Sequence, residues 1–92
     1  MEVRTVDDVL KIFNIDKSKI IIDEEELKIA NEPMPFKISN SNRKVLIVGT
    51  YEEKWLDIVE CEDFFIIFMD NMKPKQIDKK TGEIKDYKVL VH

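Results

Sequence analysis

The chain has 92 residues, a length that accommodates one domain with one hydrophobic core. Its composition, 43% apolar and 37% charged with two glycines and three prolines, is typical of a packed globular protein and unlike that of a disordered chain. The net charge is −4, the single cysteine excludes an internal disulfide framework, and no apolar stretch approaches the roughly 20 residues of a membrane span. We therefore expect one domain over residues 1–92, located in the cytoplasm.

Residues 5–14 are predicted to form an amphipathic helix. Thr5 can cap the first turn, and Asp8 stands three residues later, where a capping box places its acidic partner. Asp7 and Asp8 also meet the positive end of the helix dipole. Four apolar residues have the spacing of one helical face: Val6, Val9, Leu10 and Phe13.

Residues 20–22 are three consecutive isoleucines, a β-branched run that favours a strand. The next segment, 23–31, fits two structures. Asp23 and Glu26 stand in capping-box register and predict a short helix, whereas alternating apolar residues within the segment are typical of a strand. Of the two, we predict the helix.

The segment that follows is rich in turn signals. Prolines at positions 33 and 35 push the residues before them out of the helical region and predict an extended segment. Residues 37–38 are predicted as a brief edge strand, and the Ser-Asn-Ser-Asn run over 39–42 as a loop. An apolar run over 45–48 then predicts a buried strand.

Segment 50–61 also fits two structures. Thr50 and Glu53 stand in capping-box register, and the apolar residues behind them share one helical face, which predicts a helix. The competing structure is a hairpin that turns at Glu52 and Glu53, with Trp55 and every second residue after it on one face of the second strand. That hairpin lacks the Asn or Gly that its tight turn would favour. We therefore predict a helix over 50–61.

Residues 64–69 are apolar at every position, which predicts a central strand covered on both sides. Segment 76–84 predicts a hairpin in which Gly82 supplies a positive φ near the turn, and Tyr87 begins an alternating strand after it. Together these elements predict an α+β fold. The N-terminal helix packs on a mostly antiparallel sheet of four to five strands that ends in a C-terminal hairpin.

The predicted core takes Ile66 and Phe68 as the inward residues of the central strand. The other side chains of that strand, Phe65, Ile67 and Met69, would then need cover from a second copy, so we expect a homodimer. The side chains predicted to be buried together are Val6, Val9, Leu10, Phe13, Val45, Ile47, Ile66 and Phe68.

Most catalytic and metal-binding chemistry lacks its side chains here. His92, the single histidine, stands at the end of the chain, where it is poorly placed to pair with a nucleophile. Cys61 is expected to be a small buried hydrophobe, and one cysteine with one histidine cannot complete a zinc site. Two glycines cannot build a phosphate-binding loop. Gly49-Thr50 is expected to be a plain strand-to-helix turn with a capping threonine, and the alternative is an anion site at its free N–H groups. We predict no cofactor, no metal and no enzymatic activity.

Charge is unevenly distributed along the chain. Residues 1–70 hold sixteen acidic and nine basic side chains, whereas residues 71–92 hold three acidic and six basic. The acidic part predicts a surface for a partner protein with a basic surface, because complementary charge speeds association. The candidate partner-binding residues are Glu52, Glu53, Asp57 and Glu60. The basic hairpin predicts an alternative nucleic-acid site, in which lysines meet phosphates and an aromatic ring stacks on a base. Its candidate residues are Lys73, Lys75, Lys79, Lys80 and Tyr87.

Three classes of function fit these patterns. We favour a small acidic protein-binding module of the inhibitor, immunity, antitoxin or phage-accessory type, which needs no catalytic residues. The alternative is a nucleic-acid-binding protein that uses the lysine-rich hairpin. The third is a small carboxylate-dependent enzyme, which a cleft containing a carboxyl group of strongly raised pKa would indicate. Thirteen isoleucines against five leucines, and thirteen lysines against two arginines, are typical of an AT-rich genome and indicate a low-GC bacterium, a phage or an archaeon.

Overall fold

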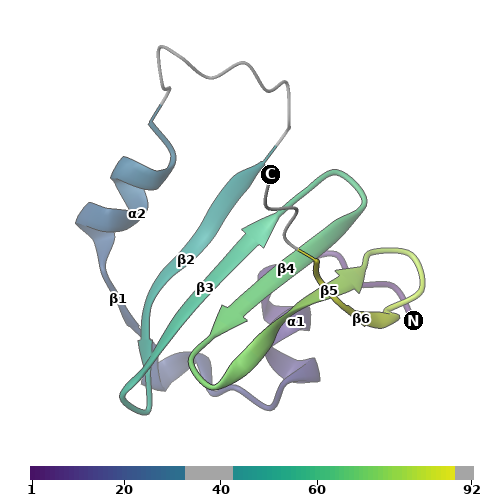
Figure 1. Ribbon diagram of the computed structural model, residues 1–92, viewed down its shortest axis with the longest axis horizontal. Helices are drawn as coiled ribbons and strands as arrows, with labels where there is room; N and C mark the ends of the chain where they lie inside the picture. The colour runs from purple at the N-terminus through teal and green to yellow at the C-terminus, as the bar shows by residue number, and fades with distance from the viewer. Residues whose placement is uncertain (33–42, 89–92) are drawn as a thin grey trace.

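The structure, a computed structural model, describes residues 1–32 and 43–88. Six antiparallel strands form one sheet whose spatial order follows the sequence (Figure 1). This confirms the α+β class with an antiparallel sheet, although the described strands number six rather than four to five. The strands are β1 (Ile21–Ile22), β2 (Lys44–Tyr51), β3 (Lys54–Glu60), β4 (Phe64–Met69), β5 (Met72–Asp78) and β6 (Ile84–Asp86). The helices are α1 (Val6–Ile12), a 3-10 turn (Lys17–Lys19) and α2 (Glu24–Ala30).

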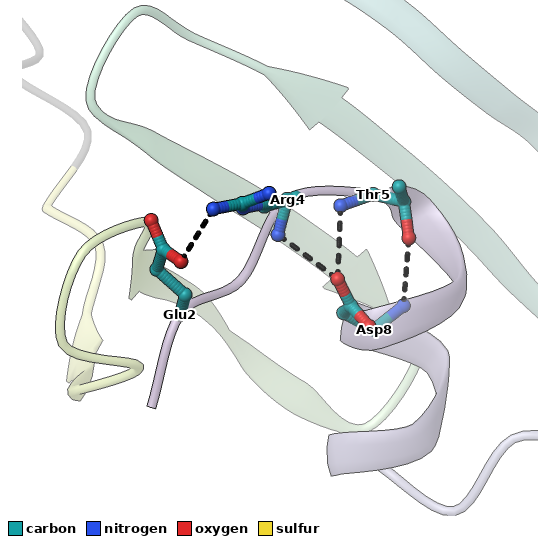
Figure 2. A network of polar contacts seen from close by, with 4 residues as sticks. All are labelled: Glu2, Arg4, Thr5 and Asp8. Carbon is teal, nitrogen blue, oxygen red and sulfur yellow. Dashed lines mark hydrogen bonds and ion pairs between the residues drawn. The ribbon is translucent and has the colours of Figure 1, made fainter.

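Helix α1 begins where its capping box predicts. The Asp8 backbone N–H donates to Thr5 Oγ1 at 3.3 Å, and the Thr5 backbone N–H donates to Asp8 Oδ2 at 3.1 Å (Figure 2). The Arg4 backbone N–H donates to the same carboxylate at 2.9 Å, and its guanidinium pairs with Glu2. These backbone hydrogen bonds, from Arg4 first and then Thr5, lower the pKa of Asp8.

One face of the sheet packs against α1, which lies behind the sheet in Figure 1. Val9 and Leu10 of the helix are buried against strand residues that include Ile58 and Ile67. Val3, from the segment before the helix, joins this core, and its N–H donates to the Lys79 carbonyl at 2.8 Å. The buried members are Val3, Val9, Leu10, Ile15, Ile47, Leu56, Ile58, Phe65, Ile67 and Ile77.

The helix predicted over residues 50–61 is wrong, because the segment forms the β2–β3 hairpin. Thr50 pairs with Trp55 and Tyr51 with Lys54, so the chain turns at Glu52 and Glu53. Both glutamates take the left-handed conformation, with φ of 50° and 63°, which is what a two-residue hairpin turn demands and what glycine or asparagine would adopt at lower cost. Pairing with strands on both sides of β3 outweighs that local cost.

The inward face predicted for the central strand is also wrong. Strand β4 is indeed central, between β3 and β5, but Phe65 and Ile67 face α1 and are fully buried. Ile66 and Phe68 point to the opposite face, as does Val45, which pairs with Val59 next to Ile66. A shift of one residue in a strand exchanges its faces.

The homodimer prediction assigns Phe65, Ile67 and Met69 to a face that a second copy has to cover, and this assignment is wrong. Phe65 and Ile67 are buried within the chain, and Met69 packs against the same core. These side chains therefore give no reason to expect a homodimer.

The alternating strand predicted to begin at Tyr87 is wrong, because β6 ends at Asp86. Other local predictions agree with the structure. Strand β1 and helix α2 lie where residues 20–22 and 23–31 predict them, and Gly82 has a φ of 74° in the hairpin that joins β5 to β6. The predictions for residues 33–42, and for the end of the chain including His92, fall outside the described residues. Among residues 1–32 and 43–88, neither seven-residue helix is long enough to cross a membrane.

Candidate binding pocket

Helix α2 lies beside the edge of the sheet at β2 (Figure 1) and is held there by polar contacts at both of its ends. At its start, the Asp23 N–H donates to the Val48 carbonyl at 2.8 Å. At its end, the Asn31 side-chain amide donates to the Val45 carbonyl at 2.8 Å and accepts from the Val45 N–H at 2.9 Å. The Asn31 side chain therefore pairs with the edge of β2 as another strand would.

A pocket of about 760 Å³ opens between α2, β1 and the face of β2 and β3 that points away from α1. Strand alternation determines which sheet residues line it, because directly paired residues share a face. Val48 is paired with Asp57, and Thr50 with Trp55, so all four lie on the face opposite the α1 core. The lining consists of Ile21, Ile22, Asp23, Glu24, Glu26, Ala30, Val48, Gly49, Thr50, Trp55 and Asp57.

One wall of the pocket depends on a close approach of two strands at Gly49. A Cβ atom on Gly49 would lie 2.1 Å from the carbonyl oxygen of Ile21, so no larger residue fits there without moving β1. This approach holds the two isoleucines of β1 at the pocket while they stay exposed, Ile21 at 73%.

Trp55 contributes the largest apolar surface of the pocket. Trp55 is 48% exposed, although a side chain as large as tryptophan usually has more of its surface buried. Its backbone is held in place by Asp70, whose carboxylate accepts from the Trp55 N–H at 2.9 Å. The indole therefore stands on a well-ordered strand but remains free to contact another molecule.

Asp57 is the most unusual group in the pocket. Its Oδ1 is buried from solvent and has no hydrogen-bond partner within residues 1–32 and 43–88. The residues beside it on the neighbouring strands, Val48 and Phe68, offer no polar side chain. Burial raises the pKa of Asp57 to about 6 from its ordinary value of 3.8, because a low-dielectric environment disfavours the charged form.

The carboxylates of α2 make the rest of the pocket acidic. Asp23 caps the helix by accepting from the Glu26 N–H at 3.1 Å, and Glu24 and Glu26 are exposed. With Asp57 they bring four carboxylates to one pocket, and none of the described residues that line it is a lysine, an arginine or a histidine. Such a pocket attracts a cation and repels an anion.

The structure separates the four residues predicted to bind a partner. Glu52 and Glu53 lie at the tip of the β2–β3 hairpin, next to the strand pair that contributes Thr50 and Trp55 to the pocket. Of the four, Asp57 alone lines the pocket. Glu60 forms an ion pair with Lys79 at 2.9 Å and lies on the α1 side of the sheet, since it pairs with Phe65.

The alternative lysine-rich site is partly occupied by internal contacts. Lys75 forms an ion pair with Asp86, and Lys79 lies over the Phe65 ring as well as beside Glu60. Lys73 and Lys80 are exposed. The Tyr87 ring packs edge-on against Phe68, with ring centroids 6.2 Å apart, and its hydroxyl accepts from the Arg43 guanidinium at 3.1 Å.

Two further sequence predictions concern reactive groups. Cys61 is a free, buried thiol, as predicted, and burial raises its pKa. Gly49-Thr50 is not a strand-to-helix turn, because both residues lie within β2. Tyr51 accepts a hydrogen bond from the Asp16 N–H at 3.2 Å and packs against the core. Among the residues that the structure describes, no three carboxylates, histidines or cysteines gather as a metal site would require.

Sequence reasoning missed most of the pocket. The hairpin alternative for residues 50–61 placed Trp55 and Asp57 on one face, and that signal could have found half of the site. The other half of the pocket lies between Ile21 and Ala30, and no sequence pattern placed it beside β3. It is brought there by contacts of β1 and of the ends of α2 with β2.

Comparisons with known proteins return nothing: no family model, no curated protein and no solved structure matches the chain. The functional argument therefore rests on the chemistry and geometry of the pocket.

Proposed function

We propose that the chain is a small cytoplasmic protein-binding module that acts by binding a partner protein with a basic surface. It would belong to the inhibitor, immunity, antitoxin or phage-accessory kind of protein. The observation that carries the proposal is the pocket, where the exposed Trp55 and Ile21 stand among four carboxylates.

An exposed tryptophan beside exposed isoleucines is typical of a protein interface. Aromatic residues at the centre of such an interface contribute most of the binding energy, and a polar rim surrounds them. Here Trp55 and Ile21 provide the apolar centre, while Glu24 and Glu26 provide an acidic rim. Complementary charge would steer a basic partner to this surface and exclude an acidic one. Glu52 and Glu53, at the adjoining hairpin tip, would extend the acidic surface.

The test begins with capture of partners from the source cells and compares three forms of the protein. Wild type is compared with a charge reversal of the rim, Glu24→Lys with Glu26→Lys. The matched control, Glu62→Lys with Asp63→Lys, makes an equal charge change at exposed positions between β3 and β4, at the other end of β3. We expect the rim variant to lose a partner that wild type and control both retain.

The purified partner then allows a kinetic measurement. The rim variant should bind it with a lower association rate, and the difference should shrink as salt is raised, because salt screens exposed charges. Equal binding by all three forms would contradict the proposal. If capture instead returns nucleic acid, and its binding is lost only when Lys73 and Lys80 are changed to glutamate, the nucleic-acid alternative is supported.

A second candidate function has one specific observation in its favour. A carboxyl group whose pKa is raised to about 6 within a pocket also suits a general acid or base, which points to a small carboxylate-dependent enzyme. The residues paired directly with Asp57, Val48 and Phe68, supply no nucleophile and no second acid–base group, so we rank this function below protein binding. Turnover of a chromogenic ester, phosphoester or glycoside that Asp57→Asn abolishes would reverse this ranking.

A further inference from the structure

We propose that the pocket receives one arginine side chain of the partner protein, with its guanidinium against the Asp57 carboxylate and its stem along Trp55 and the β1 isoleucines. This inference rests on the proposed function, because it names the group of the partner that the pocket binds. It also goes further, since it assigns a chemical role to each wall of the pocket.

The Asp57 carboxylate favours the binding of a cation. Its charge is shared by two oxygens, and Oδ1 is buried without a hydrogen-bond donor among the described residues. Because the residue itself lines the pocket, a cation there compensates the shared charge without contacting the buried Oδ1. A desolvated carboxylate without a partner is costly, and a cation with hydrogen-bond donors removes that cost. None of the described residues that line the pocket is basic, so they leave this charge for a cation of another molecule to balance.

The apolar walls favour a guanidinium over an ammonium. The indole of Trp55 is half exposed at the pocket, and arginine stacks on aromatic rings while it donates to a carboxylate. A guanidinium is also more weakly hydrated than an ammonium, so it enters a partly apolar pocket at lower cost. The methylene stem of an arginine can pack along Ile21 and Ile22.

The remaining carboxylates act at longer range. Asp23, Glu24 and Glu26 line the same pocket from α2, so they raise the local concentration of cations. They are also the titratable groups that face Asp57 across the pocket, since the residues beside it on β2 and β4 are Val48 and Phe68.

The test uses N-acetyl-arginine amide as the probe. Trp55 is the only tryptophan in the chain, so its fluorescence and the nuclear magnetic resonance signal of its indole N–H report directly on the pocket. We expect saturable binding of the arginine amide. N-acetyl-citrulline amide, a neutral compound of nearly the same shape, should bind at least about tenfold more weakly. N-acetyl-lysine amide should fall between the two.

Variants of the protein locate the contact. Asp57→Asn should weaken binding of the arginine amide at least about tenfold, because it removes the charge but keeps the shape. The matched control Asp63→Asn, which removes an exposed carboxylate outside the pocket, should leave binding unchanged. Thermal unfolding of Asp57→Asn checks that the variant is folded.

The pH dependence provides an independent check. The probe stays charged throughout, whereas Asp57 with a pKa of about 6 becomes protonated on acidification. Affinity should therefore fall about tenfold between about pH 7.5 and about pH 5 in wild type. Asp57→Asn should show a much weaker dependence.

The outcomes separate this inference from the proposed function. Equal binding of the arginine and citrulline compounds, or unchanged binding by Asp57→Asn, would overturn the arginine site. If that happens while the rim variant still loses its partner, the protein-binding function stands without it. If the arginine amide binds as expected but the rim variant keeps its partner, the partner does not use the pocket and both proposals fail.

Discussion

The two faces of the sheet differ in what they contact and in how much they bury. On the α1 face, Phe65 and Ile67 are fully buried among apolar neighbours. On the opposite face Ile66 is also buried, but Trp55 remains 48% exposed, and the buried Asp57 Oδ1 has no hydrogen-bond partner among the described residues. Burial of apolar side chains and hydrogen bonding of polar groups stabilise a fold, whereas binding sites contain exposed aromatic side chains and polar groups without internal partners. The molecule therefore separates its stable core from its candidate site by the thickness of one sheet.

The two helices show the same difference. Helix α1 contributes Val9 and Leu10 to the core and has a complete capping box. Helix α2 has the same length but no buried residue, and it is attached to β2 mainly by hydrogen bonds at its two ends. A helix held in this way opens at lower free energy than one packed into a core. The side of the molecule with the pocket is thus the side that can adapt to a partner.

The largest expected effect tests the assignment of the faces. Phe65→Ala should destabilise the protein by about 3–5 kcal/mol, because it leaves a cavity in the α1 core. Phe68→Ala, on the same strand but half-buried on the other face, should cost no more than about 2 kcal/mol. Urea denaturation of both variants measures the difference. Equal losses of stability, or a larger loss for Phe68→Ala, would contradict the assignment of Phe65 to the core face of β4.

A smaller effect tests how α2 is attached. Asn31→Ala removes both hydrogen bonds to the Val45 backbone and should cost about 1–2 kcal/mol. The loss should be local, so amide hydrogen exchange should speed up in α2 and stay unchanged in α1. Glu32→Ala, at the exposed next position, is the matched control. Equal acceleration of exchange in both helices would show that α2 and α1 unfold as one unit.

The smallest effect concerns the charge of Asp57. Its pKa is higher in the folded protein than the ordinary value, so the folded state binds a proton more tightly than the unfolded chain, and this group makes the protein less stable as pH rises from about 4 to about 6. Asp57→Asn should therefore raise the melting temperature at neutral pH. The gain should shrink as pH falls through 6 towards 4, where wild-type Asp57 is also neutral. A variant less stable than wild type at neutral pH would show that the carboxylate has a stabilising contact in solution.

Some elements of the fold can be predicted from residues that are neighbours in the chain. The helix over residues 5–14 has its cap, its acidic first turn and its apolar face within ten residues, and Thr5 and Asp8 form the expected capping box. The strand over 64–69 is apolar throughout, and the hairpin between β5 and β6 has Gly82 at the position that needs a positive φ. In each case the residues that decide the structure are neighbours in the chain, so the sequence pattern contains the whole signal.

Other parts of the sequence fit two local structures equally well, and contacts between distant segments select one of them. Residues 50–61 satisfy a helix and a hairpin almost equally, and the hairpin wins because β3 gains partners on both sides, in β2 and β4. Strand β4 is apolar on both faces, so its alternation cannot say which face is inward; the position of α1 decides it. The pocket has the same origin. Asp57 lines the same pocket as Glu24 and Glu26 because hydrogen bonds between distant segments hold α2 against β2. The sequence of neither segment contains a pattern that predicts these contacts.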